Sequence, residues 1–81
     1  MNKKCYVLTC NCYSGDNYVL VFLDETKAYK TMIADLETEI TNLQNSGYKF
    51  ESAENDDSAE LYVSGGDIYY EWNIEESEIR E

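Results

Sequence analysis

Residues 59–76 read AELYVSGGDIYYEWNIEE, two stretches rich in strand-forming residues on either side of the pair Gly65-Gly66. The two central positions of a type I′ turn both need a positive φ, which glycine adopts without steric cost. A turn at these glycines fixes the register of a hairpin. On one side it pairs Val63 with Ile68, Leu61 with Tyr70, and Ala59 with Trp72. We predict that this apolar side forms the core.

The other side of the same hairpin brings like charges together. Tyr62 lies opposite Tyr69 and Glu60 lies opposite Glu71, with Glu75 further along the strand. Two carboxylates directly across from each other destabilise a pair of strands. Because folding gains nothing from this arrangement, we interpret this side as the best indication of a functional surface.

A helix is predicted from about residue 25 to residue 45. Asp24 is a suitable N-cap, and Gly47 suits the left-handed position after the last turn. Between them, apolar residues recur with the three-four spacing of one helical face. This stripe consists of Tyr29, Met32, Ile33, Leu36, Ile40 and Leu43. The opposite face is expected to carry Lys27, Lys30, Thr31, Asp35, Thr38 and Glu39.

The remaining segments are predicted to be strands. Residues 4–13 and 18–23 flank a loop of turn-forming residues at 14–17 and should form a first hairpin. If Tyr13 faces Tyr18, the inward pairs are Cys12 with Val19, Cys10 with Val21, and Leu8 with Leu23. Residues 48–54 alternate as a further strand, and pairing Glu54 with Ala59 places Phe50 opposite Val63.

These elements predict an α+β fold in the order β-β-α-β-β-β. The expected architecture is a two-layer sandwich in which one helix covers one face of a five-stranded, mainly antiparallel sheet. The length of 81 residues fits a single domain, residues 1–81, with one modest core. The acidic tail from residue 75 to 81 is expected to fray beyond the last strand.

The charge of the chain excludes two classes of partner. With 17 acidic residues against 6 basic ones and no histidine, the net charge is -11. Such a surface repels nucleic acid and anionic membranes, so we expect neither direct nucleic-acid binding nor membrane binding. The N-terminal stretch lacks the apolar region of a signal peptide, and no segment reaches the ~20 apolar residues that span a bilayer. We therefore expect a cytoplasmic protein.

The sequence offers little catalytic chemistry. Without histidine, no Ser-His-Asp, Cys-His or histidine-metal arrangement is possible. Cys5, Cys10 and Cys12 lack the paired spacing of zinc and redox sites, and we interpret them as reduced, buried, small apolar residues. The acidic loop at 55–57 does not match a calcium loop. We expect no metal, no cofactor and no enzymatic activity.

The sheet face opposite the helix is the remaining candidate surface. It is expected to display Tyr13, Tyr18, Leu20, Phe22, Tyr62 and Tyr69, surrounded by Glu51, Glu60, Glu71 and Glu75. One interpretation is a solvated face whose acids keep a small domain in solution. The other is a protein interface, because tyrosines are preferred anchors and a contiguous apolar patch indicates a partner or a second copy.

In its size, its net charge of -11, its lack of histidine, its tyrosine-rich strands and its acids spaced along strands and turns, the chain resembles the small acidic proteins that phages and mobile elements encode against host defence. Anti-CRISPR and anti-restriction proteins are examples. The resemblance implies a non-enzymatic inhibitor in the bacterial host cytosol, a DNA mimic whose carboxylates stand in for phosphates. Its partner would be a nuclease or other nucleic-acid-binding protein with a basic groove.

On this hypothesis the partner-binding residues are Glu51, Asp56, Asp57, Glu60, Tyr62, Asp67, Tyr69, Glu71 and Glu75. The alternative hypothesis is a structural homo-oligomer, for example a homodimer. In that case Tyr18, Leu20 and Phe22 of the open sheet face bury against a symmetry mate.

Overall fold

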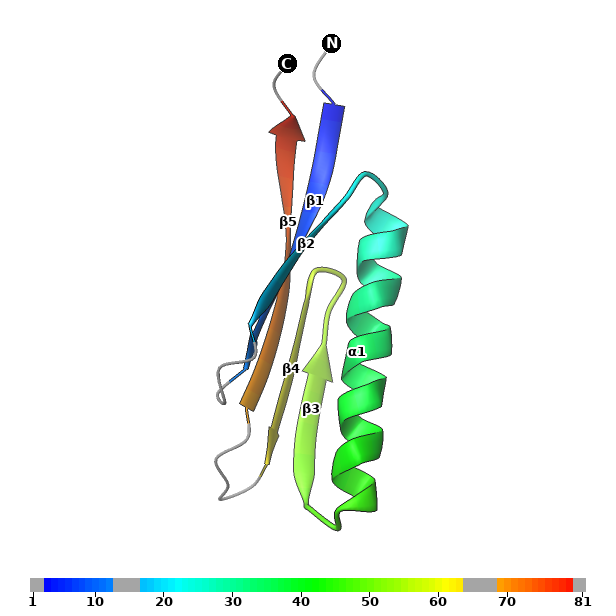
Figure 1. Cartoon of the computed structure of the whole chain (residues 1–81), viewed down its shortest axis with the longest axis vertical. Coiled ribbons are helices and arrows are strands. Elements are labelled where there is room, and N and C mark those ends of the chain that lie inside the picture. Colours follow the sequence, from blue (N-terminus) through cyan, green and yellow to red (C-terminus); the bar gives the residue numbers. More distant parts are fainter. Residues whose placement is uncertain (1–2, 13–16, 64–68, 80–81) are drawn as a thin grey trace.

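The computed structural model describes residues 3–12, 17–63 and 69–79, which form one helix and a five-stranded antiparallel sheet. The elements are β1 (Lys3–Cys12), β2 (Tyr18–Phe22), α1 (Glu25–Asn45), β3 (Phe50–Glu54), β4 (Ser58–Val63) and β5 (Tyr69–Ile79). The strand order is β2-β1-β5-β4-β3, so the first and last strands are neighbours in the middle of the sheet. The helix lies along one face (Figure 1). The predicted two-layer α+β sandwich is confirmed.

The hairpin of β4 and β5 has the predicted register. Ala59 pairs with Trp72, Glu60 with Glu71, Leu61 with Tyr70, and Tyr62 with Tyr69. Phe50 of β3 lies opposite Val63, also as predicted. The turn at Gly65-Gly66 and the pair of Val63 with Ile68 involve residues outside the described ranges.

The ends of α1 follow from local hydrogen bonds. The Asp24 side chain accepts a hydrogen bond from the Thr26 backbone N–H at 2.8 Å, which satisfies one of the free amides of the first turn. After Ser46, Gly47 has a φ of +78°, a conformation that favours glycine, and the Tyr48 N–H donates back to the Leu43 carbonyl. The predicted bounds and both caps are therefore confirmed.

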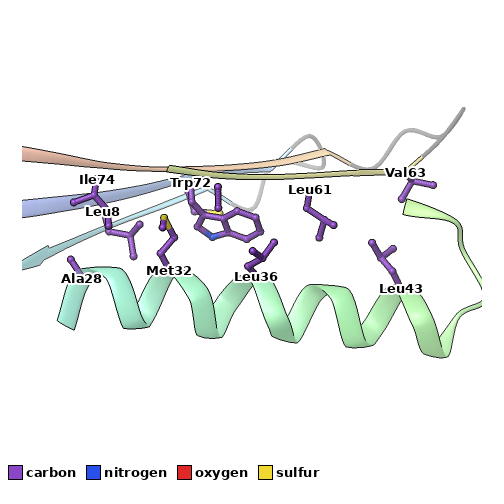
Figure 2. Packing of buried hydrophobic residues seen from close by; sticks show 11 residues of the cluster. Leu8, Ala28, Met32, Leu36, Leu43, Leu61, Val63, Trp72 and Ile74 are labelled. Atoms are coloured by element: carbon purple, nitrogen blue, oxygen red, sulfur yellow. The ribbon is translucent and has the colours of Figure 1, made fainter. Parts of the chain in front are cut away.

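The core lies between α1 and the sheet face that it covers (Figure 2). Leu8, Met32, Leu61 and Trp72 are the largest side chains that are fully buried, and the Trp72 ring stacks on Tyr70 with centroids 5.6 Å apart. Burying a side chain of this size contributes about 1.5–3 kcal/mol.

The first hairpin has a different register from the predicted one. Tyr6 pairs with Phe22, Leu8 with Leu20, and Cys10 with Tyr18, a shift of three residues. An odd shift turns the whole strand over, because successive side chains point to opposite faces. The expected placement of Tyr18, Leu20 and Phe22 on the open face is therefore wrong, since all three lie on the helix side. Tyr13, which defined the predicted register, lies outside the described residues.

The physical reason is the reach of the side chains. The rings of Tyr18 and Phe22 pack against the core from the edge strand, and the Tyr18 hydroxyl donates a hydrogen bond to Asp35 of α1. Valine is shorter than these rings and has no hydroxyl, so it could not make the same contacts. Val19 and Val21 instead point outward and are 61% and 62% exposed. Next to Tyr18, the Asn17 side chain accepts a hydrogen bond from the Cys12 N–H at 2.8 Å.

The acidic tail does not fray at residue 75, contrary to the prediction. β5 continues to Ile79 and pairs with β1 as far as Lys3. In the pairing region Lys4 Nζ lies 3.6 Å from Glu76 Oε2, so a lysine-bearing strand partly offsets the acids. The ends of β1 and β5 extend beyond the helix (Figure 1) and give a molecule with dimensions of 50 × 21 × 16 Å.

Candidate functional site

The open face, defined as the sheet residues that point away from α1, has two different halves. Strand alternation from the observed registers puts Val7, Val19 and Val21 on the half formed by β1 and β2. The half formed by β3, β4 and β5, called the acidic half below, carries the residues Glu51, Glu60, Tyr62, Tyr69, Glu71 and Glu75. The aromatic residues expected from β2 are replaced by valines.

The predicted partner-binding residues are mostly brought together. Six of them make up the acidic half. Asp56 and Asp57 lie exposed in the loop between β3 and β4, beside the point where the Ile74 N–H donates to the Asp57 carbonyl at 2.7 Å. Asp67 lies outside the described residues.

Glu71 is held in place within the acidic half. Its two carboxylate oxygens accept from the Tyr69 hydroxyl at 2.7 Å and from the Asn73 amide at 3.0 Å. These two hydrogen bonds hold the pKa of Glu71 below its usual value, and the Glu71 carboxylate in turn raises the pKa of Tyr69 to about 12. Glu71 is therefore ionised at neutral pH and cannot swing freely away from Glu60 on the next strand.

A second tyrosine is tied to a carboxylate in the neighbouring row. Tyr62 pairs with Glu51 of β3, and a hydrogen bond to Glu51 raises the pKa of Tyr62. The row across β5, β4 and β3 thus reads Tyr69, Tyr62, Glu51. It presents two aromatic rings whose hydroxyls stay protonated at neutral pH.

A shallow hollow of about 560 Å³ lies beside β5. The lining residues are Thr9, Asp57, Ser58, Asn73, Ile74 and Glu75. Glu71 and Glu75 are four residues apart on one strand, or ~13 Å at the strand rise, and Asn73 lies between them on the same face.

A polar cluster on the helix side was not predicted. It surrounds a hollow of about 240 Å³ and consists of Cys10, Tyr18, Asp35, Glu39, Tyr70 and Trp72. Asp35 and Glu39 were expected on the outer face of α1, but both are half-buried and face the sheet. The sequence did contain the signal: Glu39 is three residues after Leu36 and four before Leu43, on the apolar stripe itself.

The electrostatics of this polar cluster disfavour charged groups. Burial, together with Asp35, Cys12 and Glu39, raises the pKa of the Cys10 thiol to about 11. Burial and then Glu39 raise the pKa of Asp35, and burial followed by hydrogen bonds with Glu39 and Cys12 raises the pKa of Tyr70. At neutral pH Cys10 is a thiol and not the reactive thiolate. The three cysteines are buried and unbridged.

A larger groove lies at the N-terminal end of α1. Its volume is about 750 Å³, and Tyr6 and Ile74 supply its apolar surface. Its other lining residues are Glu25, Glu54, Asn55, Asp56, Asp57 and Glu76. Asp56 and Asp57 therefore contribute to this acid-rimmed groove as well as lying near the acidic half.

Within the described ranges, no group of three or more His, Cys, Asp or Glu residues is arranged to hold a metal ion. No helix among the described residues is long and apolar enough to cross a membrane.

Comparison of the chain with protein-family models, curated proteins and solved structures finds no match.

Proposed function

We propose that this protein is a non-enzymatic inhibitor that binds another protein through the acidic half of its open face. The partner is a host defence protein, such as a nuclease, and the contact is its basic nucleic-acid-binding groove. The carboxylates of the acidic half take the place of phosphates, as in anti-CRISPR proteins that mimic DNA. One observation carries this proposal: Glu60 and Glu71 lie directly opposite each other, and Tyr69 and Asn73 hold Glu71 in that position.

The charge distribution supports a basic partner. The described residues of β3, β4 and β5 include no lysine or arginine, and they place four glutamates on the acidic half. A patch of one sign steers an oppositely charged partner and can raise the association rate to about 10⁸–10⁹ M⁻¹s⁻¹ at low salt. The affinity should then fall steeply as salt screens the charges.

Tyr62 and Tyr69 give the same surface a means of holding the partner after encounter. Tyrosine is enriched among the residues that dominate interface energetics, because it combines a rigid ring with a polar end. Both rings lie in the row next to Glu60 and Glu71. A partner's arginine can stack on such a ring while it pairs with the adjacent carboxylate.

The test uses two variants with the same change of charge. Immobilised wild-type protein, Glu60→Lys and Glu37→Lys are compared for the proteins that they retain from a bacterial lysate at low and high salt. Glu37 is exposed on the far side of α1. A protein that wild type and Glu37→Lys retain, that Glu60→Lys loses, and that duplex DNA displaces supports the proposal. Retention that is equal on all three columns, or indifferent to salt, contradicts it.

Adding Glu71→Lys to Glu60→Lys should abolish whatever binding the single variant keeps. The purified partner then allows inhibition of its nucleic-acid binding to be measured directly. Retained protein whose nucleic-acid binding is unaffected by saturating inhibitor would show binding without inhibition and would limit the function to an interaction module.

A homo-oligomer remains the second candidate, on different residues from those first expected. Val19, Val21 and Leu23 are 61%, 62% and 71% exposed, and they belong to the edge strand β2 or follow it directly. An uncharged apolar edge strand favours pairing with another chain. Sedimentation of the native protein at micromolar concentration distinguishes the two, because a strict monomer excludes this candidate.

A further inference from the structure

The sheet has a notch beside the second half of β5. β5 pairs with β1 over residues 70–79, but it pairs with β4 only over residues 69–73. The hydrogen bond from the Ile74 N–H to the Asp57 carbonyl, at 2.7 Å, closes that side. Beyond it, no strand in the described part of the chain lies beside residues 75–79 on the β4 side. Figure 1 shows the turn between β3 and β4 ending well short of the upper ends of β1 and β5.

The backbone of β5 is oriented to accept another strand there. The Ile74 N–H points toward the β4 side, and alternate residues of a strand point their backbone groups the same way. The N–H of Glu76 is therefore directed into the notch. An edge of this kind is a template for an added strand, and five residues of it span ~17 Å.

The groove at the N-terminal end of α1 adjoins this edge. Ile74 and Glu76 of β5 form one wall, and Glu25 with the loop between β3 and β4 forms the others. Five carboxylates line the groove, those of Glu25, Glu54, Asp56, Asp57 and Glu76. Lys4 Nζ lies 3.6 Å from the carboxylate of Glu76, and both side chains are more than half exposed. Such an exposed pair is weak and exchangeable.

We propose that the notch binds an extended basic segment of another protein, which adds a strand to β5 beyond the end of β4. Side chains of the added strand that point to the helix side enter the groove. Lysines or arginines there meet the carboxylates, and their alkyl stems cover Tyr6 and Ile74. Charge complementarity identifies the occupant as basic, and the open edge identifies it as extended. This site is separate from Glu60 and Glu71 and does not depend on the function proposed above.

The probe is a fluorescein-labelled heptapeptide of alternating lysine and valine, and the readout is fluorescence anisotropy with the full chain. We expect Glu76→Lys and Asp56→Lys each to weaken binding about tenfold, the scale of one lost charge-assisted contact. Glu37→Lys, the same change of charge at an exposed position of α1 outside both surfaces, should change it less than about threefold. Equal losses in all three variants would show non-specific attraction and overturn the proposal.

The second arm separates strand addition from charge alone. A heptapeptide with the same side chains but with every backbone amide N-methylated has no backbone N–H to donate along either edge. We expect it to bind about tenfold more weakly than the parent peptide, since it loses several hydrogen bonds to β5. Equal binding of the two peptides would refute strand addition. Because Asp56 lies exposed in a loop, Asp56→Lys keeps the test decisive even if Glu76→Lys disturbs β5.

Discussion

Replacing one member of the opposed glutamate pair should stabilise the fold, and replacing the other should not. Glu60→Gln removes one of two like charges that face each other across β4 and β5, and it keeps the size of the side chain. Within the described ranges no hydrogen bond of Glu60 opposes this gain, whereas Glu71 accepts hydrogen bonds from Tyr69 and Asn73. Glu71→Gln relieves the same repulsion but weakens two hydrogen bonds to a charged group.

The magnitude follows from the geometry of the pair. A directly opposed cross-strand pair contributes about 0.2–1 kcal/mol, with the unfavourable sign for like charges. For a domain of this size, 1 kcal/mol shifts the unfolding midpoint by about 4–8 °C. Glu60→Gln should therefore raise Tm by about 1–8 °C. Glu71→Gln should leave Tm unchanged or lower it, because a hydrogen bond to a charged group contributes about 1.5–3 kcal/mol before solvent exposure reduces it.

The assay is thermal unfolding followed by circular dichroism, in low salt and again in 1 M salt, where the screening length falls to about 3 Å. The advantage of Glu60→Gln should largely disappear in high salt. If Glu71→Gln stabilises the protein as much as Glu60→Gln does, the hydrogen bonds to Glu71 do not hold it as described. If the gain persists in high salt, like-charge repulsion is not its cause.

Two further predictions test the face assignment and the pH dependence. Val21→Thr should change the free energy of unfolding by no more than about 0.5 kcal/mol, whereas Phe22→Ala should cost roughly 2 kcal/mol, since Phe22 packs on the core. The register expected from the sequence predicts the reverse order, and urea unfolding of the two variants decides. Tyr69 has a pKa of about 12 in the folded state against 10 unfolded, so its contribution is complete below pH 10 and is lost as pH rises through about 12. Between pH 10 and pH 12, the free energy of unfolding should fall less steeply with pH for Tyr69→Phe than for the wild type, as measured by urea unfolding at a series of pH values. Equal slopes for the two proteins would refute the hydrogen bond from Tyr69 to Glu71.

The two hairpins show how far the sequence could predict the fold. In the C-terminal hairpin, the pair Gly65-Gly66 in the sequence predicts a single register, and every described pair is as expected. Residues 14–17 include several turn formers but no single turn, so several registers were compatible with the apolar pattern of the first hairpin. Choosing between them required knowing which side chains can reach α1 from an edge strand. That is a property of the packed structure and not of the local sequence.

The C-terminal half of β5, which was expected to fray, is a strand because it pairs with β1. Ile79 pairs with Lys3, at the other end of the chain, and an acid-rich tail alone gives no sign of that partner. The strand order was also not predicted, because antiparallel hairpins can be joined in several orders. The notch beside β5 follows from the different lengths of its two neighbours. β1 pairs with β5 as far as Ile79, whereas β4 pairs with it only as far as Asn73.

Among the described residues, two pairs of neighbouring acids have opposite surroundings. Asp35 and Glu39 are one helical turn apart and half-buried, and burial raises the pKa of Asp35. Hydrogen bonds with Tyr18 and Tyr70 link these two carboxylates to the sheet, so this pair is used within the fold.

Glu60 and Glu71 have the opposite setting. They point away from α1, and the partners of Glu71 fix it on the surface and keep it ionised. Neither hydrogen bond joins β5 to another element, because Tyr69, Glu71 and Asn73 all belong to the same strand. The arrangement therefore costs stability without closing any tertiary contact. We propose that a positively charged partner surface meets both carboxylates at once, because the fold itself does not use this repulsion.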